Sequence, residues 1–250
     1  AAGIDFVQEV FACAGAVERD YPDADAVVEL GGEDAKIIFF KGGLEERMNG
    51  SCAGGTGAFI DQMATLLGIT VDELDRLSLQ HEKIYSIASR CGVFAKTDIQ
   101  PLLNQGAKKE DISASILQAV VDQTVAGLAQ GRKIEGKVIF LGGPLFFLAG
   151  LRDRFQKTLK LDDEHAVFPK NGDCFVGYGA ALYAANLQDT SYEEVLQKIE
   201  SATEVKTESI TLSPLFNSDE EYAAFRARHA KADAPRRELA SYTGKAYLGI

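Results

Sequence analysis

The first 187 residues alternate between short continuous apolar runs and longer stretches in which apolar residues recur at helical spacing. The continuous runs predict buried strands over 26–30, 36–40 and 136–141. The helical spacing predicts helices over 4–19, 58–67, 72–79, 94–104, 111–129, 146–159 and 175–187. A short extended segment is expected at 84–88. This mixture of strands and helices predicts an α/β fold.

The hydrophobic pattern changes in the last quarter of the chain. Residues 188–240 are polar and charged, with amphipathic stretches at 192–199 and 220–231. The final residues resemble the beginning of another strand. The chain is therefore expected to divide into three parts, namely a module at 1–187, a polar helical linker at 188–244 and the first strand of a second module at 245–250.

Composition and charge narrow the classes of function. The chain has 250 residues, with 26 Lys plus Arg against 37 Asp plus Glu and a net charge of −11. That acidity argues against electrostatic binding of nucleic acid. No apolar run approaches the roughly 20 residues of a membrane span. Four cysteines are too few for a disulfide scaffold, so we expect a reducing, cytoplasmic compartment with thiols available for other chemistry.

Glycine exceeds its usual share of about 7%, with 24 residues, and the first glycine-rich turn follows the strand at 26–30. Gly31 and Gly32 stand among the acids Glu29, Glu33 and Asp34. Glycines let a phosphate approach backbone N–H groups, and carboxylates can hold Mg²⁺ or a water molecule bound to it. The alternative is a plain hairpin turn between two strands.

Two cysteines each stand in front of a predicted helix. Cys52 lies in the glycine-rich loop at 49–57, and Cys91 precedes the helix at 94–104. A helix N-terminus favours a thiolate and offers N–H groups to a phosphate. The alternative is a pair of buried core thiols. Two thiolates cannot complete a four-thiolate iron–sulfur cluster, whereas a two-fold dimer can supply two from each chain. The loop residues expected to contact nucleotide are Gly54, Gly55 and Thr56.

A third turn, Gly142-Gly143-Pro144, joins the strand at 136–141 to the next helix. Proline suits the first helical position, and a strand followed by two glycines and a helix N-terminus can let a nucleotide lie against the backbone. The remaining cysteines, Cys13 and Cys174, are interpreted as core or surface thiols. The three histidines are flanked by charges and are interpreted as solvated.

Taken together, these motifs resemble those of the ATP-dependent activators of 2-hydroxyacyl-CoA dehydratases and the related benzoyl-CoA reductase ATPase subunits. The resemblance covers about residues 1–187. Residues 29–36 stand in place of the family's Asp-Ile-Gly-Gly-Gln-Asp-Ser-Lys, with Glu29 for the Asp and Glu33 for the Gln. The further matches are 49–57 with the family's Asn-Asp-x-Cys-Ala-Ala-Gly-Thr-Gly, 91–95 with its second cysteine motif, 142–143 with its adenosine turn and 177–181 with its closing helix.

The resemblance implies the actin-like fold of the acetate and sugar kinase, heat-shock 70 and actin superfamily, which is ribonuclease H-like, here with a helical insertion. It also implies ATP or ADP with Mg²⁺, and a [4Fe–4S] cluster shared across a homodimer by Cys52 and Cys91. Catalytic roles pass to Glu29, Glu33 and Asp34. The residues that inherit nucleotide contacts are Gly31, Gly32, Gly54, Gly55, Thr56, Gly142, Gly143 and Pro144.

One part of the family pattern has no counterpart in this sequence. The fold begins with a strand and an Asp-x-Gly-Ser/Thr turn that grips the nucleotide phosphates, and that turn does not occur among the 250 residues. Long members of the family carry two modules in tandem. We therefore expect an incomplete fold, most of one module followed by the start of a second, with little or no ATPase activity in the isolated chain.

The implied function is an ATP-gated transfer of one electron from a low-potential donor, such as a ferredoxin or flavodoxin, to a 2-hydroxyacyl-CoA dehydratase or a benzoyl-CoA reductase-like partner. Two other functions remain open. One is a small-molecule kinase of the same superfamily, which would have no need of the paired cysteine motifs. The other is a non-catalytic nucleotide-binding module.

Overall fold

The computed structural model of this chain describes residues 5–49, 54–89, 91–202, 213–234, 238, 240 and 242–245. Cys52 therefore lies outside the described residues, and so does the strand expected at the end of the chain, apart from Lys245. The chain divides into two compact units. The larger, Ile4–Glu194, contains the whole β-sheet, and the smaller includes Val195–Ile250.

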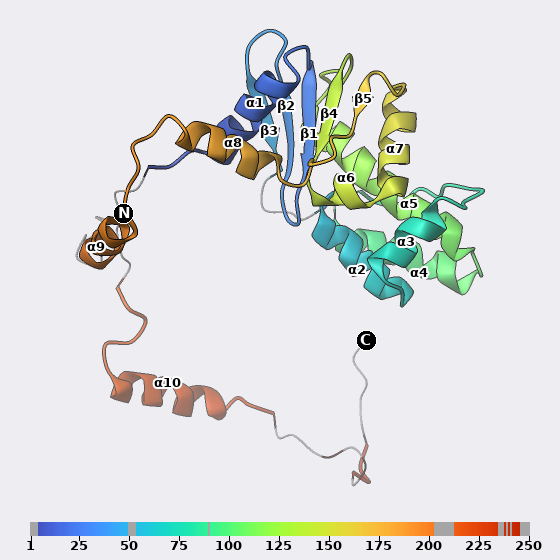
Figure 1. Ribbon diagram of the computed structural model, residues 1–250. Coiled ribbons are helices and arrows are strands. Elements are labelled where there is room, and N and C mark those ends of the chain that lie inside the picture. Colours follow the sequence, from blue (N-terminus) through green and yellow to red (C-terminus); the bar gives the residue numbers. More distant parts are fainter. Residues whose placement is uncertain are drawn as a thin grey trace. The chain divides into compact units, whose positions relative to one another are not determined.

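The helices and strands of the chain follow the order expected for an α/β protein (Figure 1). They are α1 (Glu9–Asp20), β1 (Ala26–Leu30), β2 (Ala35–Phe39), β3 (Glu45–Met48), α2 (Gly57–Leu67), α3 (Val71–Ser78), α4 (Gly92–Asn104), α5 (Lys109–Asp122), the π-helix η1 (Gln123–Leu128), β4 (Val138–Leu141), α6 (Gly143–Phe147), α7 (Ala149–Leu159), β5 (Ala166–Val167), α8 (Phe175–Ala184), α9 (Tyr192–Ala202) and α10 (Asp219–Ala230).

The five strands form one mixed sheet in the order β3-β2-β1-β4-β5. The predicted hairpin is confirmed, because β1 and β2 pair antiparallel with Leu30 opposite Ala35. β4 joins the other side of β1 in parallel, with Val28 opposite Phe140. A parallel neighbour requires a crossover connection, and here the chain from β1 to β4 passes through β2, β3 and then the helices α2 to η1. This arrangement places the ends of β1 and β4, each followed by a glycine turn, side by side.

The core lies on both faces of this sheet. Val28 and Leu30 of β1 belong to the larger apolar cluster, with buried residues from α2, α5 and α7. Val27 belongs to a smaller cluster with Val17 of α1 and Phe175 of α8. Successive strand residues point to opposite faces, so the continuous apolar run of β1 reflects burial on both sides. Figure 1 shows α1 and α8 on one side of the sheet and the helices α2 to α7 on the other.

The observed helices differ from the predicted ones at several points. α1 begins at Glu9, not at residue 4. The helix predicted over 146–159 is two helices, because Leu148 has an extended backbone, with φ −98° and ψ 105°. Asp75 of α3 stabilises this break, because its carboxylate accepts hydrogen bonds from the N–H groups of Ala149 (3.0 Å) and Gly150 (2.8 Å). A side chain far away in sequence thus caps the second helix.

The long helix predicted over 111–129 changes register at its end. α5 continues as the π-helix η1, in which the N–H of Ala129 donates to the carbonyl of Thr124 at 3.4 Å. Gln130 (φ +46°) and Gly131 (φ +86°) then end the segment. Such π-turns occur mostly as short interruptions of α-helices. Apolar spacing alone does not distinguish them from an α-helix.

Two strands were not predicted. β3 alternates half-buried and exposed positions at the edge of the sheet, and three of its four residues are charged. It lacks the apolar run that predicts a buried strand. β5 consists only of Ala166 and Val167. Both lie at the edges of the sheet. An edge strand is defined by its pairing with one neighbour, so it need not have the apolar run of a strand that is buried on two faces.

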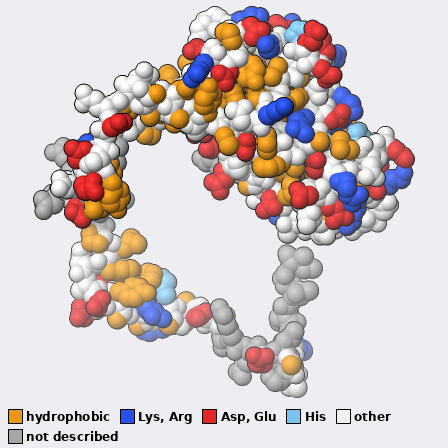
Figure 2. All heavy atoms as spheres, in the orientation of Figure 1, with side chains coloured by type: hydrophobic (Ala, Val, Ile, Leu, Met, Phe, Trp, Pro, Cys, Tyr) orange, Lys and Arg blue, Asp and Glu red, His pale blue; other side chains and the backbone are white. Residues whose placement is uncertain are grey.

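The smaller unit contains α10, which carries its own stabilising contacts. Ser218 Oγ accepts a hydrogen bond from the N–H of Glu221, and the Glu221 carboxylate accepts one from the N–H of Asn217 (2.7 Å). This is a variant of the capping box, in which the carboxylate bonds to the residue before the N-cap. The rings of Phe225 and His229 lie 3.9 Å apart. Among the described residues, no helix is long and apolar enough to span a bilayer. Figure 2 shows acidic and basic side chains interspersed over the visible face of the chain.

Candidate functional site

The turn between β1 and β2 is tight and closed by one hydrogen bond. The N–H of Gly31 donates to the carbonyl of Asp34 at 2.7 Å. Gly32, Glu33 and Asp34 are exposed, whereas the residues of both strands are buried. The hairpin therefore exposes the side chains of Glu33 and Asp34 to solvent at the end of the central strand. This is where ligands commonly bind in α/β sheets.

The beginning of α2 docks directly onto this turn. The N–H of Gly57 donates to the carbonyl of Gly31 (3.0 Å), and the N–H of Ala58 donates to that of Gly32 (2.7 Å). A Cβ atom on Gly57 would lie 3.3 Å from the Gly31 oxygen and 3.4 Å from Pro144 Cγ. A side chain at residue 57 would therefore sit tightly between the first and third turns. These two N–H groups of α2 already have protein partners, so they differ from the vacant N–H groups of a simple phosphate cradle.

The third turn is brought to the same place by a close backbone approach. Gly142 has a φ of +92°, and a Cβ atom there would lie 2.0 Å from the carbonyl oxygen of Leu30. Its N–H donates to the carbonyl of Gly172 at 2.9 Å. Only glycine combines this conformation with this proximity. The ends of β1 and β4 are thus held in backbone contact.

These approaches create one cavity shared by all three motifs. Its volume is about 350 Å³, and its wall is mostly apolar. Gly32 comes from the first turn, Gly57 from the second motif, and Gly143 and Pro144 from the third turn. The remaining lining residues are Ile60, Val71, Phe147 and Leu148. Three motifs that lie between residues 32 and 144 of the sequence therefore converge, which is the arrangement expected of a ligand site.

The loop before α2 is connected to the first turn by a side chain. Asn49 Oδ1 accepts a hydrogen bond from the N–H of Ala35 (2.8 Å), and its Nδ2 donates to the carbonyl of Glu33 (3.1 Å). Further along the loop, Gly55 has a φ of +82°, and a Cβ atom there would lie 2.9 Å from Gln123 Cγ. Thr56 is buried at the start of α2. The loop at 49–57 is therefore held at Asn49 by hydrogen bonds to the first turn and at Gly55 and Thr56 by close packing at the start of α2.

Cys91 occupies the position just before α4 and is half-buried. A Cβ atom on the next residue, Gly92, would lie 3.2 Å from Gln62 Oε1 of α2. The beginning of α4 therefore packs beside α2, the helix that follows the Cys52 loop. Two apolar side chains beside the thiol are exposed, Val93 by 69% and Phe94 by 65%. Cys52 itself lies outside the described residues.

Glu29 does not line the cavity. Its carboxylate lies 3.3 Å from Lys36 Nζ, and Lys36 also bonds to Glu9 of α1. Burial raises the pKa of the Glu29 carboxyl, although the charge of Lys36 counteracts it. For Lys36, burial opposes the charge, but the contacts with Glu9 and Glu29 outweigh it and raise the pKa. The sequence pattern gave no sign of this network beyond a lysine within a buried strand.

The other two thiols have contrasting surroundings. Cys13 is buried on α1, where burial first and the nearby Glu29 second raise its pKa far above the usual range. Cys174 is exposed, and the charge of Asp173 raises its pKa. Their interpretation as a core thiol and a surface thiol agrees with this placement. Within the described ranges, no three His, Cys, Asp or Glu side chains are grouped as a metal site.

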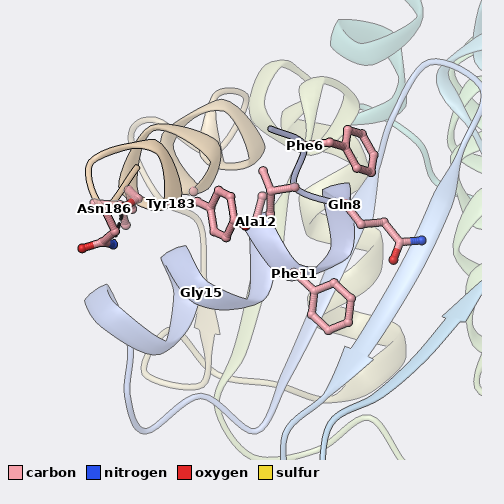
Figure 3. A pocket seen from close by; sticks show the side chains of 10 residues that line it. Phe6, Gln8, Phe11, Ala12, Gly15, Tyr183 and Asn186 are labelled. Carbon is pink, nitrogen blue, oxygen red and sulfur yellow. Dashed lines mark hydrogen bonds between the residues drawn. The ribbon is translucent and has the colours of Figure 1, made fainter. Parts of the chain in front are cut away.

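A second cavity, of about 520 Å³, lies between α1 and α8 and contains none of the predicted site residues. Figure 3 shows Phe11 and Gly15 on α1 at one side of this groove, with Tyr183 on α8 and Asn186 just after the end of α8 at the other. We therefore regard the cavity of the three glycine turns as the candidate functional site.

Comparison with solved structures defines the class of protein to which this fold and site belong. The chain is similar to the activator of the 2-hydroxyisocaproyl-CoA dehydratase from Clostridium difficile with bound ADPNP, with a TM-score of 0.64 and 29% sequence identity over 81% of this chain and 71% of that structure. The predicted actin-like α/β fold is thereby confirmed.

The sequence comparisons then give the family. Residues 7–184 match the BadF/BadG/BcrA/BcrD ATPase family, and the chain belongs to it. It is 34% identical over 167 residues to the (R)-2-hydroxyglutaryl-CoA dehydratase activating ATPase of Acidaminococcus fermentans, covering 66% of this chain and 62% of that protein. It is 30% identical over 192 residues to the 2-hydroxyisocaproyl-CoA dehydratase activator of Clostridioides difficile, covering 76% and 70%. The match thus spans less than two thirds of the first relative's length.

Proposed function

We propose that this chain belongs to an ATP-dependent activator that delivers an electron to a 2-hydroxyacyl-CoA dehydratase or a related CoA-ester reductase. In this proposal the chain contributes one wall of the nucleotide site and, through Cys52 and Cys91, half of the ligands of a [4Fe–4S] cluster. The observation that carries it is the convergence of Gly32, Gly57 and Gly143 on one cavity, in a family whose relatives are named as dehydratase activators.

The acids of the first turn are proposed to serve the nucleotide through Mg²⁺. Glu33 and Asp34 are exposed beside Gly32 at the cavity, and Mg²⁺ in nucleotide sites is held by one or two carboxylates together with phosphate oxygens and water. Glu29 is buried against Lys36. Its proposed contribution is therefore to hold the end of β1 in place beneath the turn, in addition to any role through water.

Cys52 and Cys91 are proposed as the cluster ligands. Cys91 suits this role because it is half-buried directly before α4, the helix that packs beside α2 through Gly92. Two cysteines of one chain leave a four-thiolate cluster incomplete, so the proposal includes a two-fold dimer. The exposed Val93 and Phe94 next to Cys91 are suited to burial in such an interface. When bound, the cluster supplies one-electron transfer at low potential.

The contacts of α2 offer a physical route from nucleotide to thiol. The first N–H groups of α2 bond to the carbonyls of Gly31 and Gly32, and α4 packs beside α2 through Gly92. A shift of the hairpin turn would therefore move the beginning of α2 and, with it, the loop that carries Cys52. Nucleotide can drive such a change only if its affinity differs between the two arrangements.

The deciding experiment is anaerobic iron and sulfide analysis of the full chain together with Cys→Ser variants. We expect Cys52→Ser and Cys91→Ser each to lose the cluster, because either substitution removes two of four ligands from a dimer. Cys13→Ser and Cys174→Ser are the matched controls and should retain it, since one thiol is buried in the core and the other lies at the start of α8.

Two further measurements report cluster binding independently. Visible absorbance detects the charge-transfer bands between sulfur and iron, and the oligomeric state shows whether the cluster is shared by a dimer. A chain that binds iron and sulfide equally well after both Cys52→Ser and Cys91→Ser would overturn the cluster assignment. A brown monomer would overturn the shared cluster while leaving the thiols as ligands.

A further inference from the structure

Phe147 is exposed at the mouth of the cavity formed by the three glycine turns. It is the last residue of α6, and 68% of its surface is accessible. Ligand pockets are lined predominantly by hydrophobic and aromatic side chains, so a cavity wall that includes an exposed aromatic ring is suited to hold a ligand. The proposed nucleotide site does not yet assign it a role.

The ring of Phe147 is held by its neighbours. Phe146 packs edge-on against it, with ring centroids 4.8 Å apart and planes at 87°. The backbone around it is also fixed, because the carbonyl of Pro144 accepts a hydrogen bond from the N–H of Leu148 (3.0 Å) and the carbonyl of Phe146 accepts one from Arg152 Nη1 (3.1 Å). A ring fixed in this way loses little freedom when a ligand covers its open face.

The chemistry of the cavity wall limits what can lie against this ring. Among the described residues that line it, none carries a charge. The wall beside Phe147 is made by Ile60, Val71 and Leu148, and the opposite part by glycine backbone and Pro144. A flat, neutral, aromatic group suits such a slot, whereas a phosphate does not. The exposed acids Glu33 and Asp34 flank Gly32 outside the apolar part.

We infer that Phe147 is the stacking surface for the purine base of the bound nucleotide, and so a residue that determines its base selectivity. This inference rests on the proposed function, since it places the base of the proposed nucleotide in the apolar part of the cavity and the phosphates toward the acidic turn. Stacking on an aromatic side chain needs no base-specific hydrogen bond. The site is therefore expected to prefer purines over pyrimidines because a purine has the larger ring surface to stack.

The test is calorimetric titration of the full chain, up to millimolar ligand, with ATP, ADP, UTP and inorganic tripolyphosphate, each with Mg²⁺. We expect Phe147→Ala to weaken ATP and ADP binding about 5- to 150-fold, the range that loss of one stacked base gives. Tripolyphosphate affinity should not change, because that ligand has no base. Phe147→Trp should restore ATP binding, and native protein should bind ATP more tightly than UTP.

Phe11→Ala is the matched control, because Phe11 is also exposed but lies on α1 at the other cavity. Unchanged ATP affinity in Phe147→Ala, or an equal loss of ATP and tripolyphosphate binding, overturns the stacking role while leaving the phosphate site in place. Binding of none of these ligands by the native chain overturns the proposed nucleotide site and the inference together. A change in oligomeric state alone would assign Phe147 to an interface.

Discussion

The two faces of the sheet use different means to hold their helices. The face under α2 to α7 is covered by a large apolar cluster that includes Val28 and Leu30 of β1. The face under α1 and α8 has a smaller apolar cluster, and beside it a buried lysine, Lys36, bonds to Glu29 of β1 and Glu9 of α1. The helices on one face are therefore held by the burial of apolar surface. The helices on the other face are held by apolar burial and, in addition, by ion pairs that need a specific geometry.

Each of these faces also carries a cavity. The cavity of the glycine turns, about 350 Å³, lies on the face covered by the large apolar cluster, and the cavity of about 520 Å³ lies between α1 and α8. The predicted ligand turns line the first of these and not the second. The charged network fixes α1 against β1, the strand that leads into the cavity of the glycine turns.

The strongest test of this comparison is Lys36→Met. The substitution removes the positive charge and leaves Glu29 buried without its partner. Breaking a buried pair in this way costs about 3–5 kcal/mol in free energy of unfolding. Urea denaturation at neutral pH measures the loss. The matched double variant, Glu29→Leu with Lys36→Met, removes both charges and should recover most of it. A single variant as stable as the native chain would mean that the network does not hold the α1 face.

The second test acts on the crossing of α1 and α8. A Cβ atom on Gly179 would lie 1.8 Å from the carbonyl oxygen of Ala12, so Gly179→Ala must push the helices apart. We expect a loss of about 2 kcal/mol in unfolding free energy, within the usual range for overpacking. Gly177→Ala is the control in the same helix. Its Cβ would meet no atom within 4 Å, so higher helix propensity should make it neutral or stabilising by about 0.5–1 kcal/mol.

Equal effects of the two alanines, measured by the same urea unfolding, would contradict a close helix crossing. A loss confined to Gly179→Ala, with tripolyphosphate binding retained, would sharpen the comparison, because it would separate the helix packing on the α1 face from the cavity on the opposite face.

Sequence reasoning worked best where a single physical signal decided the structure. The hairpin at Gly31-Gly32 was predicted because two apolar runs flank two glycines, and it formed with Leu30 opposite Ala35. β3 could not be predicted in the same way, because its charged edge residues carry no burial signal. The break at Leu148 also escaped, since it depends on a cap from Asp75, far away in sequence.

The candidate site divides along the same line. The three glycine turns were predicted as ligand-facing from their local pattern, and they do converge on one cavity. The sequence could not show that Glu29 lies outside that cavity, because the position of its side chain depends on the contacts among Glu29, Lys36 and Glu9 in the folded chain. Phe147 had no signal either. It reads as one more apolar residue of a helix, and only its exposure of 68% sets it apart.

The smallest expected effect tests a buried carboxylate among the helices α2 to α7. Asp111, in the first turn of α5, accepts hydrogen bonds from the N–H groups of Glu82 (2.8 Å) and Lys83 (2.9 Å). Burial opposes its ionisation, but these two bonds outweigh it and lower its pKa. Asp111→Asn keeps an acceptor and loses the charge, so we expect a cost of about 1 kcal/mol in unfolding free energy at pH 7.

The pH dependence gives the sign of this effect. A carboxyl whose pKa is lower in the folded chain contributes stability that is fully present above its unfolded pKa, near 4, and that is lost as the pH falls through the lowered folded pKa. The gap between native protein and Asp111→Asn should therefore be constant from pH 7 to about 5 and close below about 4. Asp122→Asn, an exposed position on the same helix that bonds only Gln118 among the described residues, should show no such closure. A gap that persists at low pH would assign the role of Asp111 to shape and not to charge, and would leave Lys36 and its partners as the charged anchor of the sheet.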